Sequence, residues 1–181
     1  APLRGCYITN SYAVDGVTIS TAGHSGGFVS CPGYCFVENS FCNITMYGNT
    51  DTAVFSGVDH YSDKYLNCYA SGVVEGTNGV GGFLGNPRRS TPGHSSYENC
   101  YSTTMVGMQN QAANMGGFVG VGIADEAFIN CYAAGEVGTL ETNPTPGSSS
   151  VGGFAGTMNS TCQNCIYDKQ TTAMKECLVG A

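Results

Sequence analysis

The sequence has no tryptophan and few charged side chains: Asp, Glu, Lys and Arg make up 10% of its 181 residues, where about 25% is usual. Only six residues are basic against thirteen acidic, and the net charge is −7. So few cations cannot neutralise a phosphate backbone, which argues against nucleic acid as a partner. The chain also lacks a run of about 18 consecutive apolar residues, so the sequence predicts no insertion into a membrane as a helix.

Motifs of hydrolytic enzymes are missing as well. Neither His-Glu-x-x-His nor Gly-x-Ser-x-Gly occurs, and His24, His60 and His94 stand singly in turn-like segments. Such motifs hold a catalytic zinc ion or an activated serine in metallopeptidases and hydrolases. Without them the sequence predicts no enzymatic activity, and it indicates no cofactor and no metal.

Cysteine and glycine, in contrast, are abundant. The chain has 27 Gly and an even set of ten Cys, and 41% of its residues are apolar. A cysteine content this high usually accompanies an oxidising compartment, so we expect an extracellular or cell-surface protein. Two sequons, at Asn43 and Asn159, are glycosylation candidates compatible with that location.

The most informative pattern is a repeat of an Asn, a small residue and then an aromatic or aliphatic one. It occurs six times, at intervals of 28 to 34 residues. The asparagines are Asn10, Asn39, Asn67, Asn99, Asn130 and Asn164. Four units also contain Gly-Gly-Phe, ending at Phe28, Phe83, Phe118 and Phe154, and another has Val54-Phe55-Ser56-Gly57 instead. A recurrence of this length indicates stacked copies of one supersecondary unit.

Short strands fit these units better than helices. Gly, Thr, Val, Tyr and Asn dominate them, and each glycine disfavours a helix by about 1 kcal/mol relative to Ala. We therefore predict an all-β fold, a right-handed parallel β-helix or β-solenoid of about five rungs, over residues 1–167. A cap or assembly segment is expected over 168–181, with a short helix over 171–178 as one form of the cap.

Stacking of the units predicts columns of side chains. Residues one, three and seven positions after the Asn are small or aliphatic, as on the inner face of a strand. The asparagines are expected to form an amide ladder, each bonded to the rungs above and below. The aromatic residue two positions after the Asn falls on the outer face, and we expect its ring to be half-buried with the hydroxyl in water.

Two of the motifs resemble a known repeat. The combination of Asn-Cys-Tyr-Ala, at 67–70 and 130–133, with Gly-Gly-Phe-Leu-Gly at 81–85 and Gly-Gly-Phe-Val-Gly at 116–120 resembles the GLUG-motif repeats of bacterial surface proteins. The stretch Tyr167-Asp168-Lys169-Gln170-Thr171-Thr172 is similar to the Tyr-Trp-Asp-Lys-x-Thr tail that often closes such arrays. The resemblance covers nearly the whole chain and implies a β-solenoid of the kind found in adhesins and IgA-specific metallopeptidases. It implies a repeat and no catalytic activity.

The stacking also suggests disulfides, because equivalent Cα atoms of neighbouring rungs lie about 4.8 Å apart, within disulfide range. Cys6 and Cys35 each precede their Asn by four residues, which makes them the first candidate pair. Cys68, Cys100, Cys131 and Cys165 can pair likewise or remain a buried column of thiols. The other candidates are Cys31, Cys42, Cys162 and Cys177. Cys162 and Cys165 form a CxxC, but no second CxxC exists to complete a structural zinc site.

The sequence offers two candidate sites of ligand contact. The insertion over 86–94 carries Arg88 and Arg89, which can hold a carboxylate or a sulfated sugar. Tyr69, Tyr101 and Tyr132 can offer a stacking platform to a glycan.

Carboxylates offer the remaining possibility, a polysaccharide-active enzyme of the β-helix type. The acidic residues available are Asp59, Asp63, Asp125 and Glu126. Asp63 and Glu126 share a column two rungs apart, about 10 Å, which is too wide for a retaining glycosidase. We therefore expect these carboxylates to solvate the surface.

Taken together, these features predict a non-enzymatic structural or adhesive module. Its expected partners are other copies stacked end to end or neighbouring domains of a larger surface protein. A carbohydrate-binding module is the alternative, with a glycan as ligand.

Overall fold

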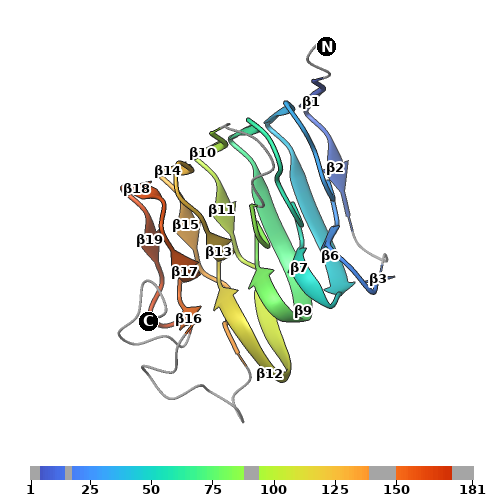
Figure 1. Cartoon of the computed structure of the whole chain (residues 1–181), viewed down its shortest axis with the longest axis vertical. Helices are drawn as coiled ribbons and strands as arrows, with labels where there is room; N and C mark the ends of the chain where they lie inside the picture. Colours follow the sequence, from blue (N-terminus) through green and yellow to red (C-terminus); the bar gives the residue numbers. More distant parts are fainter. Residues whose placement is uncertain (1–4, 15–17, 88–93, 139–149, 173–181) are drawn as a thin grey trace.

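The computed structural model describes residues 5–14, 18–87, 94–138 and 150–172. These residues form a parallel β-solenoid and contain no helix. In Figure 1 the strands lie side by side in chain order, from β1 at one end to β18 and β19 at the other. The predicted all-β solenoid is confirmed.

The first sheet takes one strand from each unit, the strand that precedes the Asn. Its six members, in their order in the sheet, are β1 (Tyr7–Thr9), β5 (Phe36–Glu38), β8 (Lys64–Leu66), β10 (Ser96–Glu98), β14 (Ala127–Ile129) and β18 (Thr161–Gln163). All of these neighbours pair in parallel with matching residues opposite one another. Val37, for example, lies between Ile8 and Tyr65.

The second sheet follows the Asn and has eleven strands. They are β2 (Tyr12–Ala13), β3 (Thr18–Ser20), β4 (Ser25–Gly26), β6 (Phe41–Tyr47), β7 (Thr50–Ala53), β9 (Tyr69–Gly81), β11 (Tyr101–Ser102), β12 (Met105–Gly116), β15 (Tyr132–Ala133), β16 (Val151–Gly152) and β19 (Ile166–Tyr167). The long strands β6, β9 and β12 lie adjacent (Figure 1). A two-stranded sheet pairs β13 (Val119–Gly122) with β17 (Ala155–Met158).

Each recurrent Asn makes the bend between the first and the second sheet. All six have a positive φ, between 49° and 54°. This left-handed conformation is costly for most residues, but Asn adopts it because its short polar side chain can bond locally. The backbone ladder continues through the bend, since the amide of Asn67 donates to the carbonyl of Glu98 at 3.0 Å.

Aromatic rings fill the interior between the sheets. One column consists of Phe28, Phe55, Phe83, Phe118 and Phe154, with centroids 4.5–5.0 Å apart. A second column of Tyr65, Tyr97 and Phe128 meets the first edge-on, as Phe128 meets Phe118 at 6.0 Å. Such contacts stabilise a core by about 0.5–1.5 kcal/mol each beyond the burial of area. Phe55, from the unit that lacks Gly-Gly-Phe, takes the same place in the column, so that the irregular unit does not interrupt it.

The paired glycines let stacked backbones approach closely. A Cβ on Gly82 would lie 2.2 Å from the carbonyl oxygen of Gly117, and a Cβ on Gly117 would lie 2.4 Å from that of Gly153. A carbon atom cannot approach an oxygen this closely, because optimal contacts lie at about 3.5–4.0 Å. The distance between rungs, and not a positive φ, therefore requires glycine here.

Strand β19 ends at Tyr167, and a turn follows it. The amide of Thr172 donates to the carbonyl of Asp168 at 3.0 Å, while the amide of Gln170 donates to the Asp168 carboxylate at 2.8 Å. The amide of Val137 bonds the carbonyl of Thr172 at 3.2 Å and ties this turn to the solenoid. The rest of the predicted cap, 173–181, lies outside the described residues.

Candidate functional site

Along the bend, the side chains of five of the six asparagines, from Asn39 to Asn164, form the predicted amide ladder on the exposed surface. Nδ2 of Asn67 donates to Oδ1 of Asn39 at 3.1 Å, and Nδ2 of Asn99 donates to Oδ1 of Asn67 at 3.2 Å. Asn130 bonds Asn99 in the same way at 3.0 Å, and Asn164 bonds Asn130 at 3.1 Å. Every interior amide is thus a donor to one neighbour and an acceptor for the other, as in a polarised hydrogen-bond chain.

The residue after each Asn forms a column of small donors that points inward. The members are Ser11, Ser40, Cys68, Cys100, Cys131 and Cys165. Each one donates to the carbonyl two residues earlier: Ser40 to Glu38 at 2.8 Å, and Cys68 to Leu66 at 3.3 Å. Serine occupies the first two units and cysteine the other four, because either side chain can give the carbonyl a second bond beside the one from the Asn amide of the neighbouring rung.

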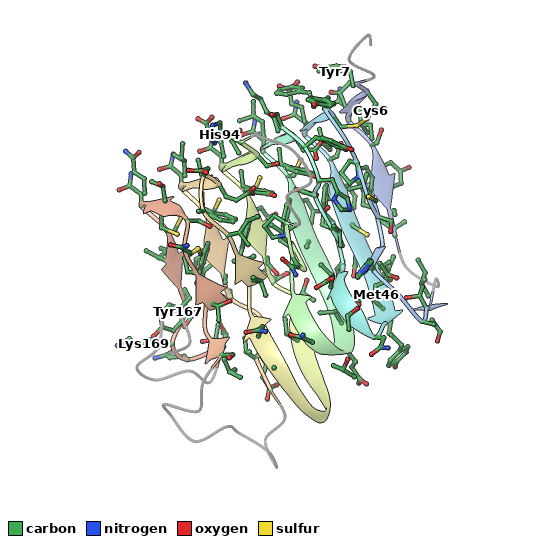
Figure 2. All side chains as sticks on the ribbon, in the orientation of Figure 1. Cys6, Tyr7, Met46, His94, Tyr167 and Lys169 are labelled. Atoms are coloured by element: carbon green, nitrogen blue, oxygen red, sulfur yellow. A yellow bond between two sulfur atoms is a disulfide. The ribbon has the colours of Figure 1, made fainter. Side chains whose placement is uncertain are left out.

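One predicted disulfide is formed. Cys6 and Cys35 are bonded, with their Cα atoms 4.5 Å apart, and Figure 2 shows Cys6 at the N-terminal edge of the solenoid. The other described cysteines are free thiols: Cys31 and Cys162 are exposed, Cys165 is half-buried, and Cys42, Cys68, Cys100 and Cys131 are buried. Of the two forms expected for the column of Cys68, Cys100, Cys131 and Cys165, the structure therefore shows the column of thiols. Cys177 lies outside the described residues.

The thiols differ in acidity according to their surroundings. Burial raises the pKa of Cys42 to about 12. A hydrogen bond from the Cys100 thiol lowers the pKa of Cys68, whereas burial raises the pKa of Cys100 far above its usual value. Cys42 and Cys100 are accordingly poor nucleophiles, because the thiolate is the reactive form.

The outer aromatic column is a stack of rings. Tyr12 and Phe41 have centroids 5.3 Å apart, Phe41 and Tyr69 4.7 Å, and Tyr69 and Tyr101 4.8 Å, all nearly parallel. Tyr132 is in register with Tyr101. Tyr69 and Tyr132 are half-buried as expected, whereas Tyr12 and Tyr101 are more exposed. Because stacked neighbours cover the ring faces of Phe41 and Tyr69, these two rings present only their edges to solvent.

The carboxylates are placed differently from the prediction. Asp59, Asp63 and Glu126 are buried, so the expectation that they solvate the surface is wrong; Asp125 alone of the four is exposed. Their burial also removes them from the outer face where a polysaccharide would bind. Hydroxyl groups of the core bond both oxygens of Asp59, whereas one carboxylate oxygen of Asp63 has no hydrogen-bond partner among the described residues.

Asp59 is the centre of this buried polar cluster. Tyr65 donates to Asp59 Oδ1 at 2.9 Å, Ser56 donates to the same oxygen at 2.5 Å, and Tyr97 donates to Oδ2. Desolvation raises the pKa of Asp59 although the three donors oppose the shift. Sequence reasoning missed this cluster; the signal was a pair of tyrosines in an otherwise apolar inner column, since a buried hydroxyl needs a partner.

Asp63 lies beside this cluster and is fully buried. Its Oδ1 accepts the amide of Cys35 at 2.8 Å, while its Oδ2 has no hydrogen-bond partner. Desolvation and the negative charge of Asp59 raise the pKa of Asp63 to about 7. Asp63 is thus a carboxyl that is held partly protonated near neutral pH.

The remaining candidates lie apart from one another. Asn43 is half-buried on β6 and Asn159 is exposed, while Arg88 and Arg89 lie outside the described residues. His24 contacts the Asp51 carboxylate at 2.7 Å, and His94 contacts the carbonyl of Asp125 at 2.9 Å.

Within the described ranges, no group of three or more His, Cys, Asp or Glu side chains is arranged to hold a metal ion. In the same part of the chain, no helix is long and apolar enough to cross a membrane. No family model, curated protein or solved structure matches this chain.

Proposed function

We propose that this chain is a non-enzymatic structural module of the extracellular space or cell surface, a rigid solenoid that serves as a spacer or adhesive rod. The observation that carries the proposal is the register of the first sheet, in which matching residues of all six units lie over one another. A continuous hydrogen-bonded stack resists bending and has no hinge between units.

Side chains reinforce the same stack. The amide ladder runs from Asn39 to Asn164 and the phenylalanine column from Phe28 to Phe154. The disulfide between Cys6 and Cys35 joins the first two units and suits an oxidising compartment. These bonds and ring contacts all run along the axis of the solenoid, and few charged groups lie outside it, which supports a mechanical role. The resemblance to GLUG-motif repeats supports the same role.

The ends of the first sheet suggest the partners. Among the described residues, β1 pairs with β5 and β18 with β14 in this sheet, so each end presents a strand edge. Such edges are templates for pairing with another strand. We propose that another copy, or a neighbouring domain of the same surface protein, continues the stack.

Electron microscopy and sedimentation at rising protein concentration test this assembly. We expect rods that lengthen with concentration. Thr9→Pro is expected to shorten them, because alternate residues of a strand direct their amides to opposite edges. The amide of Asn10 donates to the carbonyl of Glu38 in β5, which places the amide of Thr9 on the free edge. Thr9→Ala is the matched control, because it keeps the amide. Single solenoids at every concentration would exclude self-assembly, and release of reducing ends from polysaccharides would contradict the non-enzymatic role.

The exposed ring stack suggests a second candidate function, that of a carbohydrate-binding module. Sugars stack on the faces of aromatic rings, and the interior rings of this stack have both faces covered. The geometry therefore supports glycan binding less well than a mechanical role. Glycan-array signal that is lost in Tyr101→Ala, with the fold intact, would favour the second candidate over the first.

A further inference from the structure

The last unit differs from the others in one inward column. The residues two positions before the Asn are Ile8, Val37, Tyr65, Tyr97, Phe128 and Cys162. Cys162 lies in register with Phe128 in the first sheet. A thiol thus replaces a large apolar side chain at the end of the solenoid, and Cys162 is exposed whereas Phe128 is fully buried.

The bend at Asn164 brings a second thiol to the same place. Asn164 has φ 54°, and the residues on its two sides, Cys162 and Cys165, belong to the two inward columns. The Cys165 sulfur lies 3.3 Å from the carbonyl oxygen of Phe128, the residue that pairs with Cys162 in the first sheet. Cys131 is buried one rung below, so the pair that solvent can reach is Cys162 and Cys165.

We propose that Cys162 and Cys165 form a redox-active dithiol that exchanges with low-molecular-weight disulfides. This inference is independent of the mechanical role, because it rests on the last unit alone. Three observations carry it: the CxxC spacing, the position of the Cys165 sulfur beside Phe128, which pairs with Cys162, and the accessibility of both thiols beside a buried third one.

The chemistry follows from the positions of the sulfurs. The Cys165 thiolate attacks one sulfur of a disulfide RSSR, forms the mixed disulfide and releases RS⁻. Cys162 then attacks the Cys165 sulfur, gives its proton to solvent and releases a second RS⁻, which leaves a Cys162–Cys165 disulfide. Two electrons pass from the protein dithiol to RSSR, and the products take up protons to become two RSH.

The environment favours Cys165 as the attacking sulfur. Hydrogen bonds from Cys131 and Cys162 lower the pKa of Cys165, while the same bonds and burial raise the pKa values of their two donors. The Cys165 thiol also donates to the carbonyl oxygens of Phe128 and Gln163, at 3.3 and 3.6 Å, and these bonds limit the effect because they are lost when the thiol ionises.

The test uses the full chain, with Cys6–Cys35 intact, and oxidised glutathione as the probe. Non-reducing peptide mapping should find a Cys162–Cys165 disulfide. Cys162→Ser should instead retain one glutathione on Cys165, since the resolving thiol is missing. Cys31→Ser is the matched control for the other exposed thiol and should leave the disulfide unchanged. Circular dichroism checks that each variant keeps the fold.

Alkylation by iodoacetamide at pH 6 gives a second readout. Burial and the charges of Asp59 and Asp63 raise the pKa of Cys31, so a smaller fraction of Cys31 than of Cys165 is thiolate at pH 6. Cys165 should therefore react at least about tenfold faster, which is the ratio of thiolate fractions that a difference of one pKa unit produces. The proposal is overturned if Cys162 pairs with another cysteine, if both thiols survive the glutathione treatment, or if Cys165 reacts no faster than Cys31.

Discussion

The recurrent Asn has two roles: its side chain bonds the neighbouring rungs, and its backbone adopts a positive φ. Replacing Asn99, in the middle of the amide ladder, separates these roles. In Asn99→Ala the bonds to Asn67 at 3.2 Å and from Asn130 at 3.0 Å are both lost. The alanine must also keep a φ near 53°. Two exposed hydrogen bonds contribute about 0.5 kcal/mol each, and the left-handed conformation costs a non-glycine residue roughly 1–2 kcal/mol. We expect the free energy of unfolding to fall by about 2–3 kcal/mol.

Asn99→Gly isolates the side-chain role. Glycine adopts a positive φ without strain, so only the lost bonds and the greater entropy of the unfolded chain remain, about 1–2 kcal/mol together. Thr103→Ala, at an exposed position in the same unit, is the control and should stay within about 0.5 kcal/mol of the wild type.

Urea unfolding followed by tyrosine fluorescence and circular dichroism measures these values, and coincident transitions show that a single free energy applies. If Asn99→Ala is no less stable than Asn99→Gly, the positive φ is not the constraint on this position. If neither variant differs from the Thr103→Ala control, the ladder contributes nothing and the reasoning fails.

Three further variants test the packing and the buried carboxyl. Gly117→Ala should destabilise the fold by more than about 3 kcal/mol or prevent folding, since its Cβ would lie 2.4 Å from a carbonyl oxygen of the next rung. Phe118→Ala removes a fully buried ring between rings 4.9 and 5.0 Å away and should cost about 3–5 kcal/mol by thermal or urea unfolding. Asp63, whose pKa is raised to about 7, should make the protein less stable as pH rises from 4 to 8. Asp63→Asn should make that dependence less steep and leave the part that is due to Asp59.

The sign of the pH effect follows from the two states. Below the unfolded pKa of 3.8, Asp63 is protonated in both states and its contribution is complete. Between that pH and about 7 the unfolded chain ionises while the buried carboxyl stays protonated, so stability falls, by about 4 kcal/mol at most. Asp59, with a raised pKa of its own, acts in the same direction.

Matched controls accompany these variants. Gly23→Ala should be nearly neutral, because a Cβ there meets nothing within 4 Å. Asp125→Asn, at an exposed carboxylate, should leave the pH profile as it is in the wild type. Equal losses in Gly117→Ala and Gly23→Ala, or a pH profile as steep in Asp63→Asn as in the wild type, would contradict the assigned causes.

The sequence was sufficient to predict the parts of the fold that repeat. The spacing of the asparagines predicted the amide ladder, and the equal offsets of Cys6 and Cys35 predicted their disulfide. Both predictions succeed because identical residues in a stacked fold meet their own copies, so that periodicity alone specifies the contact.

The parts that do not repeat could not be predicted in the same way. Asp59 occurs in one unit only, and its burial depends on the hydroxyl of Tyr65, six residues further along the chain, and on that of Tyr97, which comes from the next rung. The free state of Cys68 and Cys100 was one of two outcomes that the column alignment left open, because the alignment specifies the spacing of equivalent residues and not the oxidation state of their sulfurs.

The vertical alignment of the units is tested most directly by nuclear Overhauser contacts between the side-chain amides of the asparagines. The account predicts cross-peaks between Asn67 and Asn99 and between Asn99 and Asn130, residues 32 and 31 positions apart whose amides are bonded at 3.2 and 3.0 Å. A folded protein in which these amides show contacts only to residues near in sequence would contradict the stacked solenoid.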